Sequence, residues 1–285
     1  MGAGQSNPDI SVVIPVLNGA RTIGACLDAI AAQGDAPAWE VLIVDNGSSD
    51  GTQAVVSAHP SSPTLLREGA RGPYAARNTG ARCAQGAVIA FTDADCIPEP
   101  GWLAAGWAAT RAGADLVGGR IVQIASASPS LWERYDRAVY LRQEEYVTQQ
   151  GFAATANLFV RAEAFSRLGG FRPELVASGD LEFGRRAIAA GLRLAYAESA
   201  RIRHRPRKTF RETWGLHRKL GSGFSELARA GLRGPARHDP ALRLALGDVA
   251  NLTEADGPRV RRRYLVGVHL VAMSARWVGR LTGRG

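Results

Sequence analysis

Two aspartates separated by one residue, Asp93 and Asp95, come after the apolar run Ala87–Phe91, with only Thr92 between. Side chains alternate along an extended strand, so both carboxylates can point the same way. Such neighbours repel unless a cation lies beside them, and Mg²⁺ typically takes one or two protein carboxylates together with substrate phosphates. The pair therefore indicates a metal-held diphosphate at the carboxyl edge of a sheet. An acidic turn explains the same residues without a ligand, because Asp is a common turn residue.

Polar residues also end the two strands predicted earlier in the chain. The β-branched run Ile10–Val16 leads into Leu17 and Asn18, and Trp39–Val44 leads into Asp45. In open α/β sheets, ligands bind at this edge of the strands. Asp45 can accept a hydrogen bond from a base N–H or cap the turn that follows it, and both interpretations stay open.

Two arginines, Arg71 and Arg77, lie between the third and fourth predicted strands, near the same edge. A guanidinium group matches the oxygens of a phosphate. A solvated helix face is the alternative for each arginine.

The elements that must position these residues alternate in type along the chain. Strands are predicted at 10–16, 39–44, 64–66, 87–91, 115–123, 155–160 and 193–196, and helices at 22–32, 52–58, 74–85, 101–112, 128–146, 161–168, 180–190 and beyond 209. Thr22 is expected to cap the first helix through its side chain. This alternation predicts an α/β fold with a mostly parallel central sheet flanked by helices and right-handed crossovers.

Composition is that of an ordinary globular protein, with 46% hydrophobic and 21% charged residues among 285. The net charge of +9 is uneven, because 19 Lys and Arg stand against 6 Asp and Glu from Arg201 onward. This basic part favours either an anionic partner or a solvated tail. Three cysteines without metal spacing predict a reducing compartment and no disulfide framework, and no leader or membrane-spanning run is expected.

Several other kinds of active site are disfavoured. The sequence has no G-x-G-x-x-G after its first strand, no Walker A motif and no H-E-x-x-H. Gly47–Gly51 matches G-x-S-x-G, but it comes early and Asp45 and Asp50 would crowd its serine with negative charge.

Six sequence segments, in a fixed order along the chain, resemble those of a known family. They are Ser11–Asn18, Val44–Thr52, Gly72–Gly80, Phe91–Asp95, Thr155–Arg161 and Gly169–Phe171. Together they resemble family 2 glycosyltransferases with the GT-A fold. The resemblance implies a nucleotide-diphosphate sugar as donor, with UDP favoured as the commonest nucleotide of the family. It also implies Mg²⁺ or Mn²⁺ as cofactor and inverting transfer, of a hexosyltransferase kind, to a hydroxyl acceptor such as a lipid-linked sugar or a glycan.

Site residues follow from the resemblance position by position. The donor-binding residues are expected to be Pro15, Val16, Asn18, Asp45, Arg77, Asn78, Asp93 and Ala94. Asp95 is the expected metal ligand. His204 follows the last strand and is a further metal ligand on this resemblance, or else a solvated histidine among arginines.

The segment Ser178–Arg186 resembles the block that carries the family's general base. Asp180 is therefore the expected base, with Glu182 and Arg186 in support on the acceptor side. An ordinary N-cap is the alternative for Asp180. A carboxylate at a helix start lies in the positive field of the helix, which predicts a lowered pKa. Gly179 departs from the pattern, because many members carry Glu at this position.

The predicted organisation is a disordered N-terminus at 1–9, a GT-A catalytic domain at 10–205 and a basic helical extension at 206–285. The processive pattern Q-x-x-R-W is absent, so one transfer per encounter is expected. Arg259–Arg263 precede an apolar run, which is the composition of an anchor at an anionic membrane surface or of a helix packed on the protein or a second copy. A cytoplasmic enzyme, peripheral on the inner membrane face, is therefore expected.

Two rival functions belong to other classes. Gly179 is compatible with a catalytically silent sugar-nucleotide-binding module. Nucleic-acid binding through the basic part is disfavoured, because interleaved aromatics and a recognisable reading motif are absent.

Overall fold

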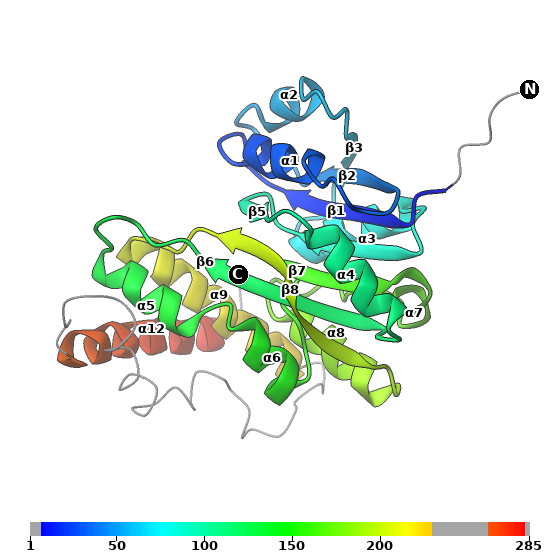
Figure 1. Ribbon diagram of the computed structural model, residues 1–285. Helices are drawn as coiled ribbons and strands as arrows, with labels where there is room; N and C mark the ends of the chain where they lie inside the picture. Colours follow the sequence, from blue (N-terminus) through cyan, green and yellow to red (C-terminus); the bar gives the residue numbers. More distant parts are fainter. Residues whose placement is uncertain (1–6, 230–261, 283–285) are drawn as a thin grey trace, which may run out of the picture. The chain divides into compact units, whose positions relative to one another are not determined.

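The computed structural model describes residues 7–229 and 262–282 (Figure 1). The chain divides into two compact units. The first comprises 1–122, 143–174 and 179–204, and the second comprises 123–142, 175–178 and 205–285. None of the helices in the described ranges is long and apolar enough to cross a membrane.

One eight-stranded sheet, in the order β3-β2-β1-β4-β7-β6-β8-β5, organises the first unit (Figure 1). Its strands are β1 (Ile10–Val16), β2 (Trp39–Asp45), β3 (Thr64–Arg67), β4 (Val88–Thr92), β5 (Cys96–Pro98), β6 (Leu116–Gln123), β7 (Asn157–Arg161) and β8 (Leu194–His204). The neighbours β3, β2, β1 and β4 are parallel, whereas β7 is antiparallel to β4 and β6, and β5 is antiparallel to β8. The predicted α/β fold is confirmed, and its sheet is mixed, with β3, β2, β1 and β4 forming a parallel part.

Helices flank this sheet because their apolar residues recur at helical spacing. They are α1 (Ile23–Ala31), α2 (Thr52–Ser57), α3 (Pro73–Cys83), α4 (Trp102–Arg111), α6 (Gln143–Gln150), α7 (Ala162–Arg167) and α8 (Gly179–Ala189). Helix α1 buries Ile23, Cys26, Leu27 and Ile30, a single stripe of the kind that packs on a core. Helix α4 packs so closely on Phe159 that position 106 must be glycine, because a Cβ there would lie 2.2 Å from the phenylalanine ring.

Three local predictions are corrected. The helix expected over 128–146 is two helices, α5 (Leu131–Val139) and α6, because Leu141 between them has a positive φ of 57° that a helix cannot contain. Strand β8 runs on to His204, and β5, a partner for it, was not predicted. Thr22 precedes α1 without a side-chain cap, since its hydroxyl donates to Gly19 O instead.

The secondary structure described in the second unit is mostly helical. Helix α5 packs with α9 (Phe210–Arg229) and α12 (Arg262–Thr282) around the buried residues Tyr135, Val139, Val268 and Ala272. Gly221 and Gly279 let α9 and α12 approach closely, because a Cβ on either would lie within about 2 Å of a backbone oxygen of the other helix. The predicted Arg259–Arg263 cluster lies at the margin of α12, and its residues 259–261 are outside the described ranges.

Candidate active site

The loops that follow β1 and β2 are tied to each other at the carboxyl edge of the parallel strands. Asn18, with a φ of 54°, donates its backbone N–H to the Ser48 hydroxyl at 2.9 Å, and its Oδ1 accepts from Ser49 N at 2.9 Å. Gly19 N donates to Thr52 Oγ1 at 2.9 Å. Parallel pairing places Pro15 and Val16 beside Val44 and Asp45. The structure thus brings the expected donor-binding residues of both strand ends together.

Asp45 is buried, and both of its carboxylate oxygens are engaged. Oδ1 accepts from Ser48 N at 3.1 Å, and Oδ2 accepts from Gln53 Nε2 at 2.6 Å. The turn-capping role left open by the sequence is therefore present. A carboxylate offers about four acceptor sites, so these two bonds leave capacity for a base N–H.

The acidic pair lies in the tight turn between β4 and β5, where Cys96 N donates to Asp93 O at 3.0 Å. Arg77 on α3 reaches it, with Nη2 2.5 Å from Asp93 Oδ1. The arginine is only 4% exposed, so this ion pair lies at the edge of the core. Ala94, between the acids, lies against the loop after β1, 3.6 Å from where a Gly19 Cβ would be.

His204 lies beside the acidic pair because of strand register. Strand β5 pairs with β8 so that Cys96 is opposite His204, and His204 Nε2 lies 3.7 Å from Asp95 Oδ2. The donor set fits a divalent cation such as Mg²⁺ or Mn²⁺, because carboxylate oxygens of Asp93 and Asp95 and an imidazole nitrogen of His204 are available. One ligand atom each of Asp93, Asp95 and Cys96 also lies within 4.8 Å of the others. Burial, reinforced by Asp93 and Asp95, raises the pKa of the Cys96 thiol well above its usual range.

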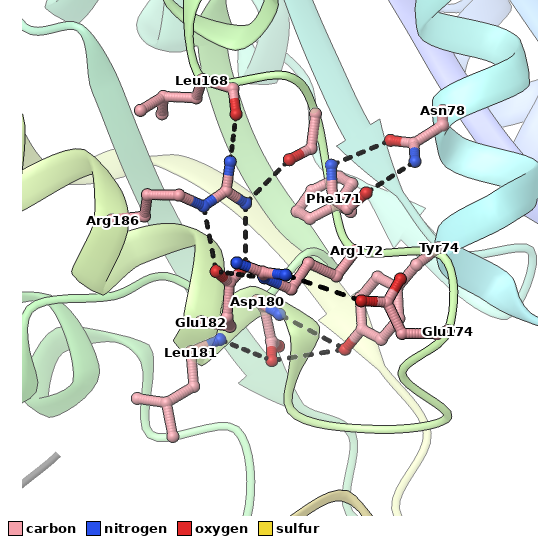
Figure 2. Close-up of polar contacts among 11 residues, drawn as sticks. Tyr74, Asn78, Leu168, Phe171, Arg172, Glu174, Asp180, Leu181, Glu182 and Arg186 are labelled. Atoms are coloured by element: carbon pink, nitrogen blue, oxygen red, sulfur yellow. Dashed lines mark hydrogen bonds and ion pairs between the residues drawn. The ribbon is translucent and has the colours of Figure 1, made fainter. Parts of the chain in front are cut away.

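Asp180 lies in the first turn of α8 and faces α3 (Figure 2). Its Oδ1 accepts from Leu181 N at 2.9 Å and from the Tyr74 hydroxyl at 3.4 Å. Burial raises the pKa of Asp180 and outweighs the opposing effects of the Leu181 N–H and of Arg77. The prediction that the helix field lowers this pKa is wrong, because desolvation of the carboxylate is the larger effect. A raised pKa makes the ionised carboxylate a stronger base.

Glu182 and Arg186 are part of an ion-pair network around the buried Glu182 carboxylate (Figure 2). Glu182 pairs with Arg172 at 2.9 Å and with Arg186 at 2.8 Å. Burial is the largest single effect and alone would raise the pKa of Glu182, but the hydrogen bonds and charges of Arg186 and Arg172 together outweigh it and lower the pKa. Arg186 also donates to the carbonyl oxygens of Leu168 and Gly170.

Asn78 holds Phe171, the residue that follows Gly170. Its amide donates to Phe171 O at 2.8 Å and accepts from Phe171 N at 2.9 Å. The amide is thus engaged in holding the loop 168–171 (Figure 2). Its expected contact with the donor stays a prediction.

At position 179, where the sequence departs from the family pattern, glycine is present for a steric reason. A Cβ at this position would lie 2.7 Å from the ring of Tyr74, closer than real side chains approach. Tyr74 was missed by sequence reasoning. The available signal was its place three residues before Arg77 on one helix, a spacing that puts both side chains on the same face.

Comparisons with known proteins agree with this architecture. The model of glycosyl transferase family 2 matches residues 11–169. Glycosyltransferase AglE of Haloferax volcanii is 36% identical over 222 residues, which cover 76% of this chain and 73% of the relative. A pre-mycofactocin glycosyltransferase of Mycobacterium tuberculosis is 29% identical over 236 residues, covering 79% of this chain but only 49% of that longer relative.

Solved structures share the fold at low sequence identity. A mannosyltransferase from Pyrobaculum calidifontis, in complex with GDP-Man and Mn²⁺, superposes with a TM-score of 0.66 at 20% identity, covering 99% of this chain and 89% of that one. Glucosyl-3-phosphoglycerate synthase of Mycobacterium tuberculosis, with Mn²⁺ and UDP, has a TM-score of 0.58 at 22% identity, covering 80% and 81%. The mixed sheet, the ordered blocks and these matches lead to one assignment: the chain belongs to glycosyl transferase family 2 and is a glycosyltransferase with the GT-A fold.

Proposed function

We propose that this enzyme transfers a sugar from a nucleotide-diphosphate sugar to a hydroxyl acceptor, with inversion at the anomeric carbon and one transfer per encounter. The observation that carries the proposal is the position of Arg77. Its guanidinium lies 2.5 Å from Asp93, and its charge also acts on Asp180. One buried cation therefore links the expected diphosphate side of the site to the expected base.

Asp180 is the proposed base, acting through its carboxylate. The carboxylate removes the acceptor's hydroxyl proton while the acceptor oxygen bonds to the anomeric carbon. The bond from that carbon to the diphosphate breaks, and its electron pair leaves with the diphosphate. Arg77 is placed to stabilise the charge that develops on this leaving group.

Asp93, Asp95 and His204 are the residues that would hold Mg²⁺ or Mn²⁺. When bound, the cation supplies Lewis-acid neutralisation of the diphosphate charge. The neighbours of similar fold were crystallised with Mn²⁺ and with either GDP-Man or UDP, so both nucleotides belong in the donor test. A UDP-sugar remains the expected donor.

A thermal-shift screen of UDP- and GDP-sugars, with and without Mn²⁺, tests donor and metal together. A ligand that binds only the folded state raises the melting temperature, so the donor should raise it and Mn²⁺ should increase the effect. Asp95→Ala is expected to abolish the Mn²⁺-dependent part. Asp180→Asn is expected to keep the donor shift while losing at least about 10²-fold in transfer.

Asp28→Asn is the matched control, because this carboxylate is 78% exposed and pairs with His59. Normal transfer by Asp180→Asn would exclude the base. Donor binding by the wild-type protein without transfer to any of a broad panel of hydroxyl acceptors would favour the silent binding module.

A second proposal concerns the exposed face of α12. Leu270, Trp277 and Leu281 are each more than 60% exposed and recur at helical spacing on one side of the helix. We propose that this face adsorbs to an anionic bilayer from the cytoplasmic side, since the unit also carries exposed cations such as Arg218 and Lys219 on α9. Co-sedimentation with phosphatidylglycerol vesicles, weaker with phosphatidylcholine, is expected to fall in Leu270→Ser/Trp277→Ser. Equal binding by the variant would contradict it.

A further inference from the structure

We propose that Tyr74 is a positioning residue for Asp180: its hydroxyl holds Oδ1 and leaves Oδ2 to take the acceptor's proton, and its ring requires glycine at position 179. The inference rests on the proposed role of Asp180 as base. It assigns a task to a side chain that neither the acidic motifs nor the family blocks single out.

The contact between the two residues is reciprocal (Figure 2). Asp180 Oδ1 lies 3.4 Å from the Tyr74 hydroxyl, and Asp180 N donates to that same hydroxyl at 3.4 Å. Leu181 N also donates to Oδ1, at 2.9 Å. Both hydrogen bonds to the carboxylate therefore end on one oxygen, and among residues 7–229 and 262–282 none ends on Oδ2. Distances of 3.4 Å are long, as is usual for such contacts before substrate binds.

The direction of the hydroxyl bond follows from the environment of Tyr74. Burial and the nearby negative charge of Asp180 raise the pKa of the phenol well above its usual value. Tyr74 therefore keeps its proton at neutral pH. A protonated phenol beside an ionised carboxylate donates to it, so this bond favours the charged form of Asp180.

The ring of Tyr74 is held on several sides. It packs on Phe171 with ring centroids 5.5 Å apart, and the Arg77 guanidinium lies 5.6 Å from its centroid. Phe171 is itself fixed by the two hydrogen bonds from Asn78. On the remaining side the ring lies over Gly179, where a Cβ would approach to 2.7 Å. Gly179 thus provides the space that brings the phenol to Asp180.

Three charged or titratable groups act on Asp180, and they come from two parts of the fold. They are Tyr74 and Arg77 on α3, and Asp93 after β4. Tyr74→Phe removes one hydrogen bond from the ionised carboxylate and leaves the other groups in place. The pKa of Asp180 should then rise, and the acidic limb of the pH profile should move to higher pH.

Steady-state kinetics of Tyr74→Phe across pH test the inference. We expect kcat to fall roughly tenfold, the donor KM to stay within about twofold, and the acidic limb to shift upward by about half a pH unit, corresponding to one weak hydrogen bond. Tyr196→Phe is the matched control, since its hydroxyl bonds Glu198 at 2.8 Å on β8. It should change none of these quantities.

The proposed steric fit between the Tyr74 ring and Gly179 can be tested by thermal stability alone, without measuring activity. Gly179→Ala should lower the melting temperature by about 2–6 °C through overpacking, and by clearly less in a Tyr74→Ser background. Equal losses in both backgrounds would contradict the proposed fit of ring to glycine.

The two proposals can fail separately. Transfer lost in Asp180→Asn but unchanged in Tyr74→Phe, with an unmoved acidic limb, overturns the positioning role and leaves the base in place. Transfer retained in Asp180→Asn overturns the base, and the positioning role with it.

Discussion

The two units of this protein both bury polar and charged side chains, but they partner them differently. In the first unit, the single guanidinium of Arg77 acts on both Asp93 and Asp180. In the second, Asp136 accepts from Arg207 through backbone and side chain at 3.0 and 3.2 Å. Tyr135 lies 3.1 Å from His269 in the same unit, and His217 lies 3.4 Å from Arg276.

The same physical effect has opposite consequences in these regions. Burial raises the pKa of Asp180, which prepares a carboxylate for proton transfer. Burial, helped by Arg276, lowers the pKa of His217 to about 3 and keeps that ring neutral. Desolvation always penalises the charged form, so its use depends on what surrounds the group. The Asp180 carboxylate, held at one oxygen, is suited to proton transfer. The neutral His217 ring, paired within a helical core, is suited to a structural role.

Arg77→Met gives the largest expected effect and tests the shared cation of the first unit. The change removes the positive charge next to Asp93 and near Asp180 while keeping apolar volume in a buried place. We expect kcat/KM to fall by about 10²–10³-fold, the size seen when a charge-stabilising donor is lost. The pKa of Asp180 should rise further, so activity should disappear at a higher pH as the solution is acidified. Kinetics across pH measure both effects.

A matched control for this change lies on the same helix. Arg82 is 67% exposed and lies 3.9 Å from Glu68, so Arg82→Met should leave the kinetics nearly unchanged. Similar losses in both variants would indicate a general effect on α3 and would contradict the role of Arg77.

The site residues at the parallel strands could be predicted from the sequence, because the ends of those strands determine where the residues lie. Asp45, Asp93 and Asp95 follow apolar runs, and parallel neighbours end at a common edge. His204 was placed near the metal residues by resemblance alone. The physical cause is the antiparallel pairing of β5 with β8, a contact between distant segments that no local pattern encodes.

Other features depended on tertiary packing and could not be read from spacing. The break between α5 and α6 depends on a positive φ at Leu141, and leucine favours a helix, so the sequence does not predict this break. The assignment of 123–142 and 175–178 to the second unit depends on long-range contacts. The sign of the pKa shift at Asp180 depends on its burial, whereas the sequence revealed only its place at the start of a helix.

A smaller effect is expected in the second unit, where His217→Gln tests the neutral buried ring. The unfolded state takes up a proton on histidine below about pH 6.5, whereas the folded state resists it down to about pH 3. Between these values the unfolded state binds more protons, so the stability of the wild-type protein rises with pH and is lost as the pH falls. One such group contributes up to about 1.4 kcal/mol per pH unit in this window.

Urea unfolding at pH 7 and pH 5, followed by circular dichroism, measures this contribution. His217→Gln should lose less stability than the wild-type protein between these two values, by roughly 1–2 kcal/mol. Leu227→Ala is the matched control on α9, because it removes buried apolar volume without a titratable group and should keep the wild-type pH dependence. If His217→Gln also kept it, the ring would be accessible to protons in the folded state. The contrast between a chemical and a structural use of burial would then fail for this unit.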